Sequence, residues 1–133
     1  MSQVQGRGAA APHRLCSIDE LAATGCREFR LGSGEWPMRG FVVRAGDGSI
    51  HAYVNRCAHQ RYPLNYDTDR FLTRDGSAIV CYVHLAMFER DTGRCFSGPC
   101  SGLSLARVPL RVEGDQVLLA DGIDPQEFAA RYA

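Results

Sequence analysis

Two short cysteine–histidine pairs constrain this chain more than any other feature of its sequence. Cys57 and His59 form a C-x-H pattern, and Cys81 and His84 form a C-x-x-H pattern further along. The members of each pair are close enough in sequence to reach one metal centre, and each pair stands where a predicted strand gives way to a loop. Two thiolates and two imidazoles suit either tetrahedral zinc or an iron–sulfur cluster. The residues alone therefore predict a metal centre and leave its kind open.

The strands and turns around these pairs predict an all-β fold. Apolar and β-branched residues form short segments, which we place at 29–31, 41–43, 50–54, 79–80, 87–89, 94–96, 108–112 and 116–120. Turn residues separate several of them, as in Gly46-Asp47-Gly48 and Asp91-Thr92-Gly93. Short strands at this spacing are typical of an antiparallel β-sandwich or small barrel. The long segment 55–76 has little strand pattern, and loops of such length are usually functional.

Short helices are expected near both ends of a single domain. Ser17 and Glu20 form a capping-box pattern, which predicts a helix over 18–23. Asp124-Pro125 supplies the N-cap and first-turn proline of a helix over 126–131. Residues 1–14 are rich in Gly, Ala and polar side chains, so we expect a flexible tail there and one domain over 15–133.

Composition excludes several classes of protein. The chain has 133 residues, of which 45% are hydrophobic and 23% charged, as in an ordinary globular domain. Its 15 basic and 15 acidic residues balance, so no overall positive field would attract nucleic acid or anionic lipid. The longest apolar run, 78–83, is far shorter than the roughly 20 residues of a membrane span, and no secretory signal is visible. We therefore expect a cytoplasmic protein with no membrane and no nucleic-acid partner.

The paired motif resembles that of the Rieske [2Fe-2S] proteins over about residues 27–120. The flanking matches are Pro63-Leu64 after the first histidine, Phe88 and Asp91-Thr92-Gly93 after the second, and Gly98-Pro99 with Ser101 and Leu105 in a third loop that looks like the family's proline loop. The resemblance implies a Rieske-like fold with a cluster-binding part over about 55–102. The gap between the two pairs is long for the family and indicates an insertion around 65–75.

The resemblance also implies the cofactor and its ligands. One Rieske-type [2Fe-2S] cluster per chain would be bound by Cys57 and Cys81 on the inner iron and by His59 and His84 on the outer iron. Because imidazole is neutral, such a cluster has a reduction potential of roughly −150 to +300 mV, compared with about −400 mV for a plant-type ferredoxin.

Four other positions within the motif resemble the oxygenase-type branch of the family. Tyr62 and Val83 stand where the respiratory-complex branch carries two disulfide-forming cysteines. Ala86 and Phe88 stand where that branch carries hydroxyl donors to the cluster sulfurs. Hydrogen bonds to sulfur stabilise the reduced state, so their absence predicts a potential in the low part of the Rieske range.

The implied function is one-electron transfer by a soluble ferredoxin without catalysis of its own. The donor would be a flavin reductase and the acceptor a terminal enzyme such as an oxygenase or reductase. The sequence has no nucleotide fingerprint and no evident second iron site of two histidines and one carboxylate. Arg56, Arg61 and Arg70 are expected to form either a solvated face or a docking patch for an acidic partner.

Three alternatives remain open from the sequence: an accessory subunit resembling the small subunit of nitrite reductase, a zinc-stabilised binding module, and a redox or cluster-loss sensor. The sensor could use Cys95 and Cys100, which flank the proline loop. Our primary expectation is that these two cysteines are structural residues, with a disulfide or second metal site as the alternative. Cys16 and Cys26 are expected to be buried small apolar residues.

Overall fold

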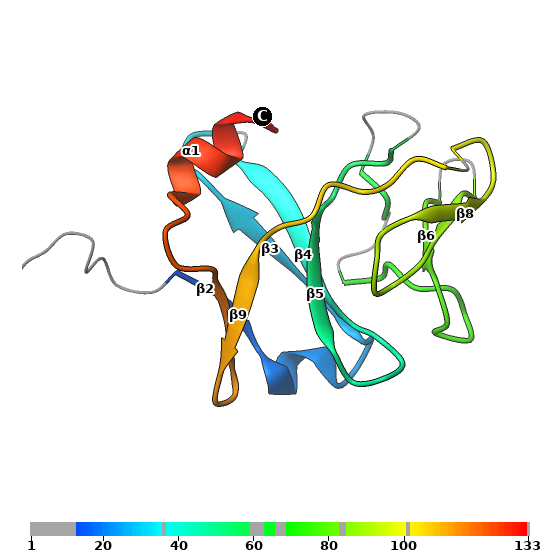
Figure 1. Ribbon diagram of the computed structural model, residues 1–133, viewed down its shortest axis with the longest axis horizontal. Coiled ribbons are helices and arrows are strands. Elements are labelled where there is room, and N and C mark those ends of the chain that lie inside the picture. The colour runs from blue at the N-terminus through cyan, green and yellow to red at the C-terminus, as the bar shows by residue number, and fades with distance from the viewer. Residues whose placement is uncertain are drawn as a thin grey trace, which may run out of the picture.

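The computed structural model describes residues 13–35, 37–58, 63–65, 69–82, 85–100 and 102–132. Its strands are β2 (Arg14–Ser17), β3 (Cys26–Leu31), β4 (Met38–Arg44), β5 (Ile50–Val54), β6 (Ile79–Val80), β7 (Met87–Phe88), β8 (Cys95–Ser97), β9 (Leu110–Glu113) and β10 (Gln116–Leu119). Its helices are the 3-10 helix η2 (Ile18–Leu21) and α1 (Pro125–Ala130). The strands form three antiparallel sheets, in the orders β2-β10-β9, β3-β4-β5 and β6-β7-β8. The predicted antiparallel all-β fold is confirmed (Figure 1).

The sheet β3-β4-β5 separates two apolar cores. Strand β4 is apolar on both faces, because Val42 points into one core while Phe41 and Val43 point into the other. We call the first the base core: Leu15, Cys16, Leu21, Phe29, Leu31, Met38, Val42, Ala52, Val54, Val108, Val117, Leu119, Phe128 and Ala129. We call the second the cysteine core: Cys26, Phe41, Val43, Tyr53, Cys57, Leu64, Phe71, Ile79, Cys81, Ala86, Phe88, Cys95, Cys100 and Leu105. In Figure 1, β2 and β9 lie on the base side and β6 and β8 on the opposite side.

Both predicted helices are present, close to their expected bounds. The Ser17 backbone N–H donates to Glu20 Oε1 at 2.8 Å, as the capping-box pattern requires, but the helix is of the 3-10 type and ends at Leu21. Asp124 caps α1 by accepting from the backbone N–H of Gln126 at 2.9 Å. None of the residues described forms a helix with the length and apolar character that crossing a lipid bilayer requires.

Strand β2 lies partly within the range expected for the tail. It begins at Arg14 and pairs antiparallel with β10, where Cys16 lies opposite Val117. This pairing joins segments that are far apart in sequence, and the short run Arg14–Ser17 shows no clear alternation of its own. Residues 1–12 lie outside the described residues.

Candidate metal centre

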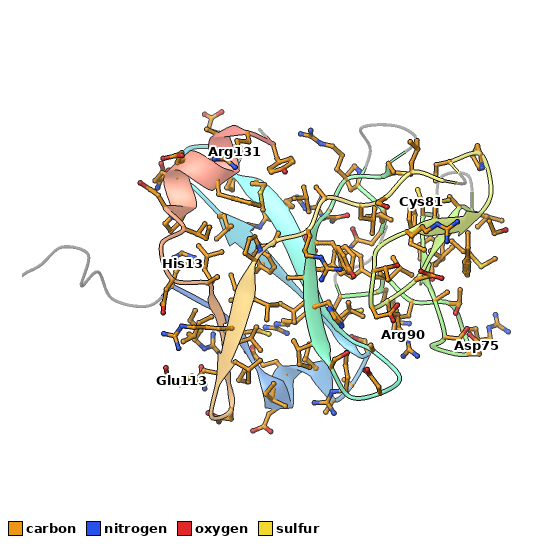
Figure 2. The ribbon with its side chains drawn as sticks, in the orientation of Figure 1. His13, Asp75, Cys81, Arg90, Glu113 and Arg131 are labelled. Carbon is orange, nitrogen blue, oxygen red and sulfur yellow. The ribbon has the colours of Figure 1, made fainter. Side chains whose placement is uncertain are left out.

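The two cysteines of the paired motif lie in the same buried core. Cys57 follows β5 and Cys81 follows β6, and their exposed fractions are 5% and 0%. Neither is in a disulfide bond. Cys81 lies beside β6 and β8, at the end of the molecule away from α1 (Figure 2). His59 and His84 lie outside the described residues, so the structure places two of the four predicted ligands.

Hydrogen bonds join the first loop, which holds Cys57, to the second loop, which holds Cys81. Asn55 is only 6% exposed, and its Oδ1 accepts from the Leu64 backbone N–H at 2.8 Å. The Leu64 carbonyl in turn accepts from the Tyr82 backbone N–H at 2.9 Å. Asn55 Nδ2 also donates to Asn65 Oδ1 at 2.9 Å. A buried side-chain amide therefore fixes the first loop, and the first loop holds the second.

The second loop turns tightly between Cys81 and Ala86. The Leu85 N–H donates to the Cys81 carbonyl at 2.7 Å, and the Cys81 N–H donates to the Ala86 carbonyl at 2.8 Å. Leu85 has a φ of 60°, a left-handed conformation that costs a non-glycine residue about 1–2 kcal/mol. Leu85 is also 65% exposed, whereas Cys81 is fully buried. The loop thus runs from the cysteine core to the surface within one turn.

A third loop, Gly98-Pro99, packs against the second. Gly98 has a φ of 99°, and a Cβ at this position would lie 2.8 Å from the Ala86 Cα. Only glycine fits both the backbone conformation and the close approach. Cys95 and Cys100 flank this loop and are each 1% exposed. Their Sγ atoms are 2.8 Å apart.

Burial raises the pKa of three of the cysteine thiols, so each of these three stays protonated at neutral pH. Burial raises the pKa of Cys26 to about 12 and that of Cys16 to about 11, which fits the predicted inert role of both. Burial also raises the pKa of Cys100 to about 12, with smaller contributions from its hydrogen bond to Cys95 and from the charges of Cys95 and Cys57.

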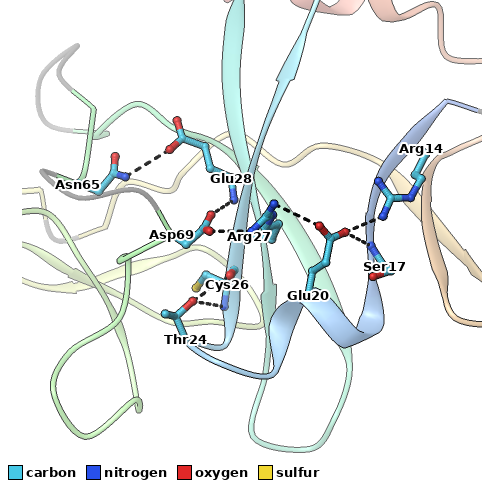
Figure 3. Close-up of polar contacts among 9 residues, drawn as sticks. All are labelled: Arg14, Ser17, Glu20, Thr24, Cys26, Arg27, Glu28, Asn65 and Asp69. Carbon is cyan, nitrogen blue, oxygen red and sulfur yellow. Dashed lines mark hydrogen bonds and ion pairs between the residues drawn. The ribbon is translucent and has the colours of Figure 1, made fainter.

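The predicted insertion is anchored to the central sheet by contacts that the sequence did not indicate. The Phe71 ring stacks on Phe41, with ring centroids 4.1 Å apart and an interplanar angle of 9°. Asp69 accepts from the Glu28 backbone N–H at 2.6 Å and forms an ion pair with Arg27 at 3.2 Å (Figure 3). The described part of this segment is thus packed on β3 and β4, and it completes one wall of the cysteine core.

The three arginines that we considered as a docking patch are not equivalent. Arg56 is half-buried, and its guanidinium donates to the backbone carbonyl of Tyr132 near the C-terminus. Arg70 is exposed, and Arg61 lies outside the described residues. The contact of Arg56 with Tyr132 gives Arg56 a structural role, which the sequence did not reveal.

Two buried cysteines in one core, presented by adjoining loops, fit a cluster that takes two cysteine ligands. Within the described ranges, no three His, Cys, Asp or Glu side chains are grouped as a metal site would need. That result is compatible with the predicted ligand set, because only two of its four members are described.

Comparison with known families decides the kind of domain. The family model described as the Rieske [2Fe-2S] domain matches residues 11–119, which is more than half of the chain. This chain belongs to the Rieske [2Fe-2S] domain family. The cofactor that family membership implies is a Rieske-type [2Fe-2S] cluster, and the buried cysteine pair provides suitable thiol ligands for it. No curated protein matches the sequence significantly.

Solved structures with the same fold include proteins of oxygenase systems. The ferredoxin of carbazole 1,9a-dioxygenase from Nocardioides aromaticivorans IC177 is 26% identical, with a TM-score of 0.61, over 84% of this Rieske chain and 98% of that one. The terminal oxygenase of the same system is 20% identical, with a TM-score of 0.65, over 85% of this chain but only 30% of that one. A chain in a complex of reduced oxygenase and oxidized ferredoxin in carbazole 1,9a-dioxygenase is 24% identical, with a TM-score of 0.60, over 85% and 95% of the two chains.

Proposed function

We propose that this Rieske protein is a one-electron carrier whose [2Fe-2S] cluster is bound by Cys57, His59, Cys81 and His84. The observation that carries the proposal is that Cys57 and Cys81, one from each half of the paired motif, lie in one buried core and are not joined by a disulfide. The family to which the chain belongs supports the same ligand pattern. We also propose that residues 15–133 form one domain, because both cores share the sheet β3-β4-β5.

The protein's own residues would direct the electron toward one side of the molecule. When bound, the cluster supplies a centre that accepts and releases one electron without protein acid–base chemistry. Cys57 and Cys81 shield its inner side from water, since they are 5% and 0% exposed. Leu85, which follows His84 in sequence, is 65% exposed, so we propose that this side of the molecule faces the redox partner. Electron exchange with a partner would then proceed through that side.

The apolar surroundings support a reduction potential in the low part of the Rieske range. Ala86 and Phe88 are both fully buried, and neither carries a hydroxyl group. These two positions therefore provide no side-chain hydrogen bond to stabilise the added negative charge of the reduced state.

For partners, we propose a flavin reductase as donor and a terminal oxygenase as acceptor. The chain is 26% identical to the Nocardioides ferredoxin and spans 98% of it, which supports a carrier. The fold shared with a chain in an oxygenase–ferredoxin complex is compatible with this pairing.

An anaerobic redox titration of two histidine variants tests the ligand assignment. We expect wild-type protein to take up one electron per chain, with a potential that falls with rising pH in the alkaline range as histidine ligands deprotonate. His84→Ala should lose its iron, whereas His51→Ala should keep the wild-type spectrum, because His51 contacts Ser49 and Arg107 on the central sheet. A folded His84→Ala protein with unchanged visible bands, or a potential independent of pH, would contradict histidine ligation at this position.

A further inference from the structure

Two thiols in the cysteine core have no part in the proposed electron transfer. Cys95 and Cys100 are each 1% exposed, and their Sγ atoms are 2.8 Å apart. The backbone holds both cysteines in place, since the Cys95 N–H donates to the Leu103 carbonyl at 2.8 Å. The Leu103 N–H donates in turn to the Cys100 carbonyl at 2.9 Å. A hydrogen-bonded turn around the Gly98-Pro99 loop therefore holds the two sulfur atoms close together.

The distance between the sulfur atoms favours a bond over a shared metal ion. Two thiolates on one tetrahedral zinc ion, each about 2.3 Å from the metal, would be about 3.8 Å apart. A disulfide bond is about 2.05 Å long. At 2.8 Å, Cys95 Sγ and Cys100 Sγ are too close to admit an ion between them and need only a small approach to bond. Among the described side chains, no third metal-ligating group joins them.

We propose that Cys95 and Cys100 form a reversible disulfide that locks the Gly98-Pro99 loop against the second loop, which holds Cys81. The oxidant is a low-molecular-weight disulfide of the glutathione type. One cysteine thiolate attacks it and releases one small thiol, and the second cysteine then displaces the other from the mixed disulfide. In total the protein loses two electrons and two protons, its S–S bond forms, and the S–S bond of the oxidant is reduced to two thiols. Excess small thiol reverses the exchange.

The position of the pair explains how oxidation would be gated. The loop between the cysteines is exposed, and Phe96 within this segment has 46% of its surface accessible. Because the sulfur atoms themselves are buried, exchange requires the loop to open. Gly98 touches Ala86 when the loop is closed, so the bond would hold the third loop on the segment that follows Cys81. This consequence for the cluster rests on the proposed function, whereas formation of the disulfide does not.

Mass spectrometry of one tryptic peptide tests the bond directly. Cleavage after Arg94 and Arg107 gives the peptide 95–107, which contains Cys95 and Cys100 and no other cysteine. Holoprotein would be equilibrated anaerobically in glutathione buffers of graded potential, quenched in acid, denatured, alkylated with N-ethylmaleimide and digested. We expect this peptide to be doubly alkylated under reducing conditions. Under oxidising conditions it should carry no N-ethylmaleimide, and its mass should be two hydrogen atoms below that of the unmodified dithiol peptide.

A second tryptic peptide is a matched internal control. Peptide 15–27 contains Cys16 and Cys26, which are also buried but lie in different cores. It should be doubly alkylated at every potential. Double alkylation of peptide 95–107 at every potential, a cross-link from Cys95 or Cys100 to another cysteine, or equal oxidation of both peptides would overturn the assignment.

The locking role is tested by the rate at which an iron chelator bleaches the visible bands. We expect several-fold slower bleaching of oxidised than of reduced wild-type protein. Cys100→Ser should bleach at the fast rate in both buffers, and Cys16→Ala should respond like the wild type. Equal rates for wild-type protein with and without the disulfide would overturn the lock. A protein without visible bands would instead count against the cluster, and the peptide measurement would still decide the disulfide.

Discussion

The base core and the cysteine core share one sheet but are built in different ways. The strands around the base core include β3 and β4, which have six and seven residues and pair along their length. The sheet beside the cysteine core consists of β6, β7 and β8, with only two, two and three residues. Much of the second core is therefore held by loops, side-chain packing and a few specific hydrogen bonds.

This difference indicates where the protein depends on its cofactor. Regular strand pairing and aliphatic packing give the base core a source of stability that needs no metal. The cysteine core instead contains Cys57 and Cys81, the two described cysteines of the metal motif. Since metal binding and folding are coupled at such sites, we expect the cofactor to supply much of the stability of the cysteine core and little of that of the base core.

The largest expected effect comes from removing a ligand. Cys81→Ser should abolish iron binding and raise amide hydrogen exchange throughout 69–100, while β3, β4 and β10 remain protected. Cys26→Ser is the matched control, because Cys26 lies in the same core but is predicted to bind no metal. Exchange that rises equally in both regions of Cys81→Ser would show that the two cores form one cooperative unit.

A pair of leucine truncations should destabilise the two cores independently, each by several kcal/mol. Leu31 in the base core and Leu64 in the cysteine core are both fully buried, so each change to alanine should cost about 2–5 kcal/mol. Leu64→Ala should lose its visible bands at a lower denaturant concentration than its far-ultraviolet signal. Leu31→Ala should shift the far-ultraviolet transition itself. Coincident transitions of both probes in Leu64→Ala would show that the cysteine core and the base core do not unfold independently.

The hydrogen bond that fixes the first loop should contribute somewhat less to stability than either buried leucine does. Asn55→Ala removes the acceptor of the buried Leu64 N–H, at a cost of about 1–3 kcal/mol. Iron release to a chelator should therefore be faster than in the wild type. Asn65→Ala leaves the bond between Asn55 and Leu64 intact and should release iron more slowly than Asn55→Ala. The reverse order of release rates would show that Asn55 does not fix the loop.

The smallest expected effect is the difference between alanine substitutions at two glycines with similar backbone conformations. Gly98 and Gly102 have φ angles of 99° and 93°, so an alanine at either position carries a similar backbone cost, about 1 kcal/mol. Only at Gly98 would the new Cβ meet another atom, the Ala86 Cα at 2.8 Å. Gly98→Ala should thus lower the unfolding midpoint of the cysteine core more than Gly102→Ala does. Equal midpoints would place the third loop away from the second.

Features with a local signal could be predicted from the sequence. The turn at Gly46-Asp47-Gly48, the capping residues Ser17 and Asp124, and the alternating strands all depend on neighbouring residues. The paired motif indicated the family because its spacing is specific. The assignment of His59 and His84 as ligands remains a prediction, since both lie outside the described residues.

Features that depend on distant contacts could not be predicted in this way. Strand β2 becomes a strand by pairing with β10 at the other end of the chain. The described part of the predicted insertion is fixed by Phe71 on Phe41 and by Asp69 on the β3 backbone, and neither contact has a periodic pattern in sequence. The contact of Arg56 with Tyr132 likewise joins residues far apart in the chain.

The central claim is that Cys57, His59, Cys81 and His84 bind a Rieske [2Fe-2S] cluster. Electron paramagnetic resonance of the dithionite-reduced protein, with iron and zinc assays on the same sample, tests it most directly. We expect a red-brown protein with two irons per chain and the low average g value of a histidine-ligated cluster. A colourless, resonance-silent protein that contains one zinc ion would contradict it, and the function would then be that of a zinc-stabilised binding module.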